Sequence, residues 1–236
     1  MDTHATYRPH TVAAGILFII ATVFLFVGEA FYKPGLTPPD ILGKAAEANS
    51  RIRLGILIEL SCVLSIPLIA IVLYPVLRKV SPVLAIGYVA FRTFEAALFA
   101  GMEVDRMLVV ALAEAVAGLP AAQIAPLEIL ARTLTGGGAW SGTTGPIYNL
   151  VFVTGMLMLN TMLWTSRLVP RWIALWGLVS ALTLGGIAIA VFFWTVPDAL
   201  AIALIAPLAV QEMVLALWFI FRGFDRAAMT RLGLMN

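Results

Sequence analysis

Histidine, cysteine and charge are scarce in this chain, and each scarcity argues against a class of protein. The chain has two histidines, His4 and His10, and both precede the first long apolar run. We therefore expect no haem or zinc ligated by histidine inside a membrane, and we predict neither a metal site nor a cofactor. Cys62 is the single cysteine, so no internal disulfide forms, and its apolar surroundings in the sequence predict a buried, inert thiol.

The low charge content has a second consequence. Charged residues make up 12% of the 236 residues, against about 25% in an average soluble domain, and hydrophobic residues make up 61%. A soluble fold of this length cannot hide so much apolar surface, whereas lipid can. The net charge of +2 is too small to indicate a nucleic-acid partner. The composition thus predicts a membrane protein whose main partner is the lipid bilayer.

Six segments are long and apolar enough to cross a bilayer, which takes about 20 mostly apolar residues. They lie at about residues 12–32, 52–77, 82–103, 146–166, 172–194 and 198–221. The first lacks a convincing cleavage pattern, so we expect it to be retained rather than removed as a signal peptide. The prediction is an all-α membrane protein, a six-transmembrane-helix bundle forming a single transmembrane domain over residues 1–236.

Basic residues in the connections orient this predicted bundle. Three regions that would share one side carry seven of them, namely Arg78, Lys79, Arg167, Arg171, Arg222, Arg226 and Arg231. The short turn at residues 195–197, on the other side, carries none. Tryptophans and tyrosines near the ends of the spans fit the same arrangement. Both termini are therefore predicted to face the cytoplasm, N-in and C-in.

Two connections on the predicted outer side contain helix signals. Thr37 as the N-cap, two prolines in the first turn and Asp40 at the third position are typical of a helix start, and we expect that helix to continue through Asn49 into the second span. In the connection between the third and fourth spans, apolar residues recur at helical spacing at Ile124, Leu127, Leu130 and Leu134. They predict a short interfacial helix there.

A few polar side chains interrupt the predicted spans near mid-depth or in their outer halves. An ionisable group there costs roughly 2.5–3.5 kcal/mol on insertion scales, so such groups are usually paired and often mark function. Those in the second, third and sixth spans are Glu59, Arg92, Glu95, Gln211 and Glu212. One arginine would face three carboxylates, so at least one carboxylate must be protonated, hydrated or bound to something else.

Two interpretations of this group stay open. In one, Arg92 neutralises two carboxylates and fixes the packing of the helices. In the other, the five side chains line a pocket open to the outer side, where Arg92 holds an anionic group or orients the carboxylates and one glutamate takes up a proton. Glu103 and Asp105 could bind a hard cation, but a solvated helix end explains them better. Ser61 and Ser65 lack a histidine base, so no catalytic residue is predicted.

Short runs along nearly the whole chain form a recognisable set. They are residues 73–77, Gly87 with Tyr88, residues 91–96, residues 169–171 with Trp176 and Gly177, and Pro207 with Gln211, Glu212, Trp218, Gly223 and Phe224. The set resembles a bacterial integral-membrane family known only as domain-of-unknown-function family 4386. The resemblance implies a six-span, multi-pass protein of the bacterial cytoplasmic (inner) membrane, with no activity to carry over.

Three function classes follow from these observations. The first is a small-molecule binding or transport-type protein, with a ligand-binding pocket of Glu59, Arg92, Glu95, Gln211 and Glu212 and a small amphipathic or anionic ligand. The alternative is a structural subunit or scaffold of a membrane complex. The third is an intramembrane enzyme acting on a lipid or quinone, which is less favoured because the sequence offers no catalytic constellation.

Overall fold

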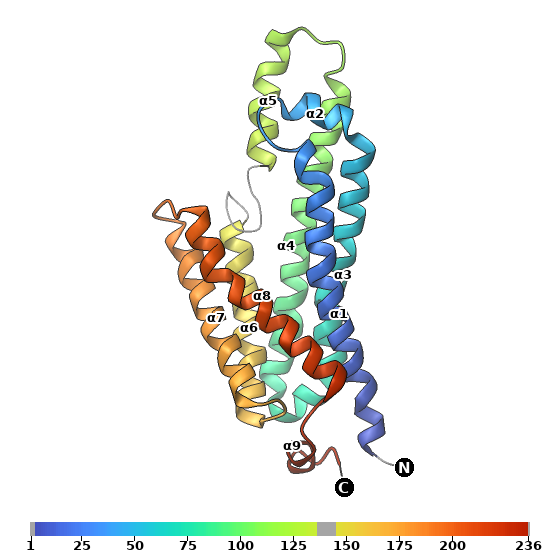
Figure 1. Ribbon diagram of the computed structural model, residues 1–236, viewed down its shortest axis with the longest axis vertical. Coiled ribbons are helices and arrows are strands. Elements are labelled where there is room, and N and C mark those ends of the chain that lie inside the picture. The colour runs from blue at the N-terminus through green and yellow to red at the C-terminus, as the bar shows by residue number, and fades with distance from the viewer. Residues whose placement is uncertain (1–2, 136–144, 236) are drawn as a thin grey trace.

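The computed structural model describes residues 3–135 and 145–235, and over these it is entirely helical (Figure 1). Its elements in chain order are α1 (Thr3–Tyr32), the 3-10 turn η1 (Lys33–Gly35), α2 (Ile41–Glu47), α3 (Asn49–Val80), α4 (Pro82–Ala115), α5 (Ala121–Thr135), α6 (Gly145–Ser166), α7 (Arg171–Ala190), α8 (Asp198–Phe221) and α9 (Arg226–Arg231).

Among the described residues, five helices are long and apolar enough to cross a membrane: α1, α3, α6, α7 and α8. Their outward side chains are large and apolar, as at Leu57, Leu64 and Leu182, which are exposed in the isolated chain. Such surfaces are stable in lipid rather than in water. The protein is therefore a helical membrane protein. The helix that contains the predicted third span, α4, is not among the five, and it continues to Ala115, beyond the predicted end at residue 103.

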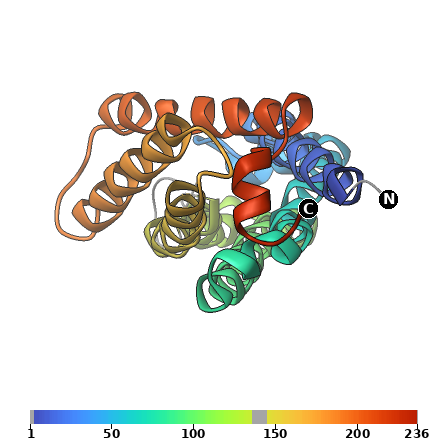
Figure 2. The same ribbon diagram turned by 90° about the horizontal axis from the view of Figure 1, so that it is seen from below.

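The six long helices form a closed cycle of contacts in chain order. Each of α1, α3, α4, α6 and α7 packs on the next long helix in the chain, and α8 returns to pack on α1. α8 crosses the front of the molecule diagonally and so joins α7 to α1 (Figure 1). Viewed from the end that carries both termini, α8 lies along one side of this ring and α9 lies in front of its middle (Figure 2). Polar residues on inward faces are therefore surrounded by helices on every side.

Two glycines bring α1 and α3 into close contact. A Cβ atom built on Gly28 would lie 2.8 Å from the carbonyl oxygen of Gly55, and one built on Gly55 would lie 2.8 Å from that of Gly28. Small residues at such crossings let the helix backbones approach. The same contact places Glu59 against α1, because a Cβ atom built on Gly28 would also lie 2.8 Å from the Cβ atom of Glu59.

Beyond the predicted third span, the end of α4 packs with α2 and α5 into a small cap. The helix predicted around residues 124–134 is present as α5, and it turns back along the end of α4 (Figure 1). The carboxylate of Glu128 accepts hydrogen bonds from the amides of Ile41 (2.8 Å) and Leu42 (3.1 Å), which fixes the first turn of α2. The cap thus has its own apolar core, which includes Ile41, Ile52, Val109 and Ala131.

The predicted start of the cap helix is partly wrong. Asp40, not Thr37, caps α2, because its carboxylate accepts a hydrogen bond from the amide of Gly43 at 3.2 Å. The hydroxyl of Thr37 instead donates to the carbonyl of Lys33 at 2.6 Å. The expected continuous helix into the second span is also interrupted, because α2 ends at Glu47 and α3 begins at Asn49.

Candidate functional site

Buried and half-buried ionisable side chains meet at two places along α4. The cap-side cluster consists of Tyr32, Glu59, Glu103 and Arg106, and the mid-ring cluster consists of Arg92, Glu95, Tyr148 and Glu212. Arg92 and Arg106 are fourteen positions apart on the same helix, which is about 21 Å along its axis. The two clusters are therefore separate sites.

In the cap-side cluster, one arginine serves two carboxylates. Nη1 of Arg106 donates to Oε2 of Glu59 at 3.1 Å and also to Oε1 of Glu103. The guanidinium carbon lies 4.3 Å from the ring centroid of Tyr32, a cation–π geometry, and the Tyr32 hydroxyl donates to Oε1 of Glu59 at 3.4 Å. Glu59 is fully buried and Glu103 is 3% exposed. Both carboxylates are thus held by charge-assisted hydrogen bonds.

In the mid-ring cluster, the arginine serves a single carboxylate. Nη1 of Arg92 donates to Oε2 of Glu95 at 2.8 Å, and the Tyr148 hydroxyl donates to the other oxygen at 3.3 Å. The guanidinium carbon of Arg92 lies 5.5 Å from the ring centroid of Phe152. A Cβ atom on Gly155 of α6 would lie 3.4 Å from Cδ of Arg92, an ordinary van der Waals distance, so α6 packs beside the arginine stem at this glycine. Arg92 and Glu95 are both buried.

Glu212, on α8, is the second carboxylate of the mid-ring cluster. Glu212 lies near enough to interact electrostatically with Arg92 and also with Glu95, Tyr88 and Tyr148. Within residues 3–135 and 145–235, however, it makes no hydrogen bond and no ion pair, and its side chain is half-buried rather than sealed. Glu212 therefore retains free acceptor capacity beside a buried ion pair.

Gln211 lies next to Glu212 in sequence but serves another contact. Its Nε2 donates to the carbonyl of Ile173 on α7 at 3.3 Å, and within the described chain its buried Oε1 has no partner. Asn160 of α6 also packs on α7, against Gly177, where any added Cβ atom would overlap the Asn160 amide. Gln211 therefore fixes the packing of α7 and α8 and does not join the arginine and glutamates.

The structure thus distributes the five sequence-predicted site residues over three places. Arg92, Glu95 and Glu212 share the mid-ring cluster, Glu59 lies in the cap-side cluster, and Gln211 lies against α7. The expectation that Glu103 belongs to a solvated helix end is wrong, because α4 continues and buries it beside Arg106.

Sequence reasoning missed Arg106 as a partner because it lies beyond the apolar run. Its spacing offered a signal: Glu103 and Arg106 are three positions apart, as are Arg92 and Glu95, and this spacing places both members of a pair on one helix face. Tyr32 and Tyr148 carried no such signal, since their roles depend on contacts between helices.

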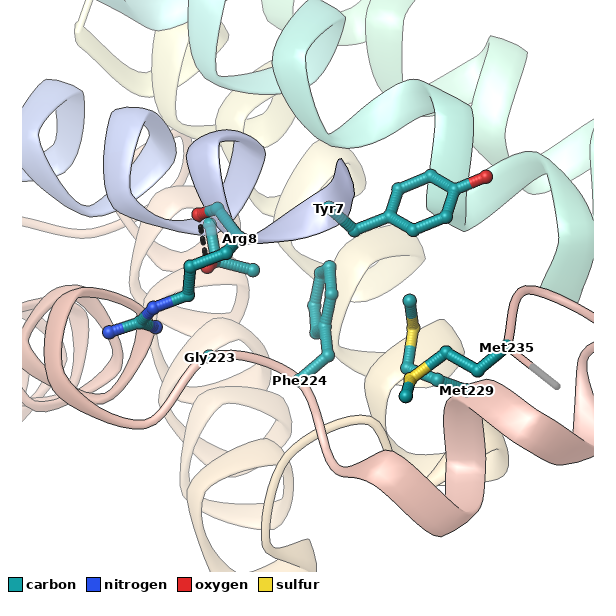
Figure 3. Close-up of a pocket in the computed structure, with 7 residues that line it drawn as sticks. Tyr7, Arg8, Gly223, Phe224, Met229 and Met235 are labelled. Atoms are coloured by element: carbon teal, nitrogen blue, oxygen red, sulfur yellow. Dashed lines mark hydrogen bonds between the residues drawn. The ribbon is translucent and has the colours of Figure 1, made fainter. Parts of the chain in front are cut away.

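Other chemistry is sparse in the described residues. They contain no group of three or more histidine, cysteine or acidic side chains suited to a metal ion. Cys62 is buried, as predicted. The protein has a cavity of about 10 Å³, about enough for one water, between the start of α1 and the segment after α8 (Figure 3).

The small cavity lies in a structural contact. Nη1 of Arg8 donates to the carbonyl of Phe219 at 3.0 Å and Nη2 donates to that of Ile220, so this guanidinium caps the end of α8. Gly223 follows with a φ of +73°, and a Cβ atom there would lie 2.8 Å from Nη1 of Arg8. A glycine is therefore required where the chain turns past Arg8, and the contact joins the two ends of the chain.

Comparison with known proteins gives the family. A family model described as "Domain of unknown function (DUF4386)" matches residues 13–223. The chain belongs to this family, as the resemblance indicated, and its apolar helices fit a membrane protein. Comparison with curated proteins and comparison with solved structures each found no match.

Proposed function

We propose that this member of the DUF4386 family is a multi-pass protein of the bacterial cytoplasmic membrane, which binds a small organic cation, in exchange for a proton, at Glu212. In this proposal all six ring helices cross the bilayer and both termini face the cytoplasm. The arginine-rich ends of α6 and α8 support this orientation, and the cap would then lie on the outer side.

The charges of α4 are compatible with a membrane span. Arg92 and Glu95 point into the ring and neutralise each other, so they do not face lipid. The outward positions of the same helix are apolar, and Val83, Ile86 and Phe94 are exposed there. Intramembrane charges are tolerated when they face the bundle interior in pairs.

One observation carries the binding proposal, namely the unpaired carboxylate of Glu212. The mid-ring cluster contains one arginine and two glutamates, and Arg92 is already paired with Glu95. An ionised Glu212 would leave one negative charge uncompensated in an apolar environment, which is costly. A proton or a bound cation removes that cost. From the sequence we expected a small amphipathic or anionic ligand, and the residual negative charge supports a cationic ligand over an anionic one.

The aromatic side chains of the mid-ring cluster support an organic cation in particular. Aromatic side chains accompany the cluster. The ring of Tyr148 lies nearly parallel to that of Phe152, with centroids 6.3 Å apart, and edge-on to that of Phe99, with centroids 5.5 Å apart. The faces of aromatic rings attract cations. The hydroxyl of Tyr88 is buried, and the described residues offer it no partner. Carboxylate and aromatic rings together provide the two interactions by which an apolar cation is bound.

The cap-side cluster supports a structural role. Of the two interpretations made from the sequence, the structural ion pair fits the cap-side cluster and the ligand site fits the mid-ring cluster. Arg106 holds both neighbouring carboxylates and joins α3 to α4. A purely structural protein is the alternative function, and it requires that Glu212 be dispensable for any binding.

Carbodiimide labelling tests the proposal. Dicyclohexylcarbodiimide reacts with protonated carboxyl groups in apolar surroundings, and mass spectrometry of the purified protein in nanodiscs would locate the adducts. We expect modification at Glu212 and protection by tetraphenylphosphonium, an apolar cation. Glu59 and Glu95 serve as internal controls and should react little, because both are buried and their oxygens already accept hydrogen bonds from an arginine and a tyrosine.

Each arm of this experiment can overturn part of the proposal. An unreactive Glu212 would refute the site. Total labelling that stays the same in the Glu212→Gln variant would show that the reagent modifies other carboxylates, and it would refute the site too. A reactive Glu212 that tetraphenylphosphonium fails to protect would refute the cationic ligand.

A further inference from the structure

Five arginines converge on one cavity at the end of the ring that carries both termini. The cavity measures about 730 Å³, within the range of about 300–1,000 Å³ that holds small-molecule ligands. Two separate chain segments contribute its arginines: Arg167 and Arg171 from the α6–α7 connection, and Arg222, Arg226 and Arg231 from the end of α8 and from α9. One acidic residue, Asp225, also lines it.

A backbone contact fixes these two segments side by side. The amide of Asp225 donates to the carbonyl of Leu168 at 2.9 Å, and Leu168 is fully buried in the apolar core. The carboxylate of Asp225 accepts a hydrogen bond from the amide of Ala228 at 2.8 Å, so it caps α9. The walls of the cavity are therefore held by the fold itself.

The arginines have more donors than the described chain satisfies. The guanidinium of Arg171 lies 5.0 Å from the ring centroid of Trp164, and Arg231 donates to the carbonyl of Ser166 at 3.5 Å. For the side chains of Arg167, Arg222 and Arg226, the described residues supply no hydrogen bond and no ion pair. Five cations against one carboxylate repel one another, and guanidinium groups bind phosphate oxygens in a bidentate manner.

Tryptophans place this cavity at the level of lipid headgroups. Trp218 lines it, and Trp164, Trp172 and Trp176 lie at the same ends of α6 and α7. Tryptophan is enriched where a membrane meets water. The general preference for basic residues on one side explains why arginines lie at this end. It does not require that two segments bring five of them to one cavity.

We propose that this cavity binds the phosphate of an anionic phospholipid from the leaflet nearest the chain termini. Basic cavities between spanning helices at the cytoplasmic surface suit such headgroups. The inference uses none of the residues proposed to bind the cation, so either proposal can fail without the other.

Native mass spectrometry of the full chain tests it, with phosphatidylglycerol as the anionic probe and phosphatidylcholine as the neutral one. We expect the protein to retain phosphatidylglycerol in preference, and the double variant Arg167→Gln/Arg226→Gln to bind it about tenfold more weakly or worse. Both arginines are exposed, so folding should be unaffected, and thermal unfolding of the variant checks this.

The matched control is the double variant Arg78→Gln/Lys79→Gln, which removes the same charge from the same end of the molecule but outside the cavity. It should retain phosphatidylglycerol as the unaltered chain does. An equal loss in the control would show a diffuse charge effect and refute the site, as would equal retention of the two lipids. Displacement by excess inorganic phosphate would refute a lipid source and indicate a soluble phosphate.

Discussion

The cap-side and mid-ring clusters have the same composition, one arginine, two glutamates and a tyrosine, yet their arginines are used differently. Arg106 contacts both of its glutamates, whereas Arg92 pairs with Glu95 and leaves Glu212 without a hydrogen bond in the described chain. Composition alone therefore does not separate a structural ion pair from a binding group. The two clusters differ in the packing of the helix that supplies the second carboxylate.

That helix explains the difference. In the cap-side cluster, the second carboxylate comes from α3, which packs directly on α4 and is drawn close to α1 at Gly28 and Gly55. In the mid-ring cluster it comes from α8, which packs mainly on α1 and α7. Glu59, on a helix that packs against α4, forms an ion pair with Arg106. Glu212, on a helix that packs elsewhere in the ring, forms no ion pair with Arg92 in the described chain. Substitution of the second carboxylate should therefore cost stability in the cap-side cluster, where it is Glu59, and should cost function in the mid-ring cluster, where it is Glu212.

The largest effect is expected for Arg106→Ala. It leaves Glu59 and Glu103 buried without their counter-ion, and breaking a buried pair in this way costs about 3–5 kcal/mol. The measurement is thermal unfolding in detergent, followed by the reaction of a fluorogenic maleimide with Cys62, which is 3% exposed in the folded protein. Arg106→Lys keeps the charge and should lose less. A loss no larger than that of Glu212→Gln would contradict the comparison.

A smaller loss is expected for Arg92→Ala, because only one directly paired carboxylate loses its partner. We expect about 3 kcal/mol, the lower end of the range for a broken buried pair. The double variant Arg92→Ala/Glu95→Gln should recover part of this loss, since it removes the stranded charge as well. The same cysteine assay gives all four corners of the cycle. Strictly additive losses would show that the two side chains do not interact.

Apolar runs predicted most of the fold, because lipid-facing helices are selected by composition. The predicted runs at residues 12–32 and 52–77 lie within α1 and α3, and the last three lie largely within α6, α7 and α8. The same criterion ended the third run at residue 103, twelve residues before α4 does. From composition alone, Glu103 and Arg106 are expected to be solvent-exposed. Whether a charged side chain can be buried depends on its partner, and a partner of Arg106 is Glu59 on α3, which the local sequence does not reveal.

The site shows the same division between local and long-range information. The pairing of Arg92 with Glu95 was predictable from a spacing of three. The separation of Gln211 from Glu212 was not, since neighbouring residues on a helix point about 100° apart and only the packing of α8 decides which of them faces the ring. The pairing of Glu59 with Arg106 required the full length of α4, which no local pattern supplied.

The smallest change in stability is expected for Glu212→Gln. The substitution preserves shape, and the described chain gives this half-buried carboxylate no hydrogen bond to lose, so the change in unfolding free energy should stay within about 0.5 kcal/mol. Glu59→Gln is the matched control: it makes the same chemical change where Arg106 and Tyr32 both donate to the carboxylate, and it should be clearly more destabilising. Equal losses in the cysteine assay would mean that Glu212 is bound into the structure as firmly as Glu59. The mid-ring cluster would then be a second structural ion-pair network, and the open carboxylate on which the binding proposal rests would not exist.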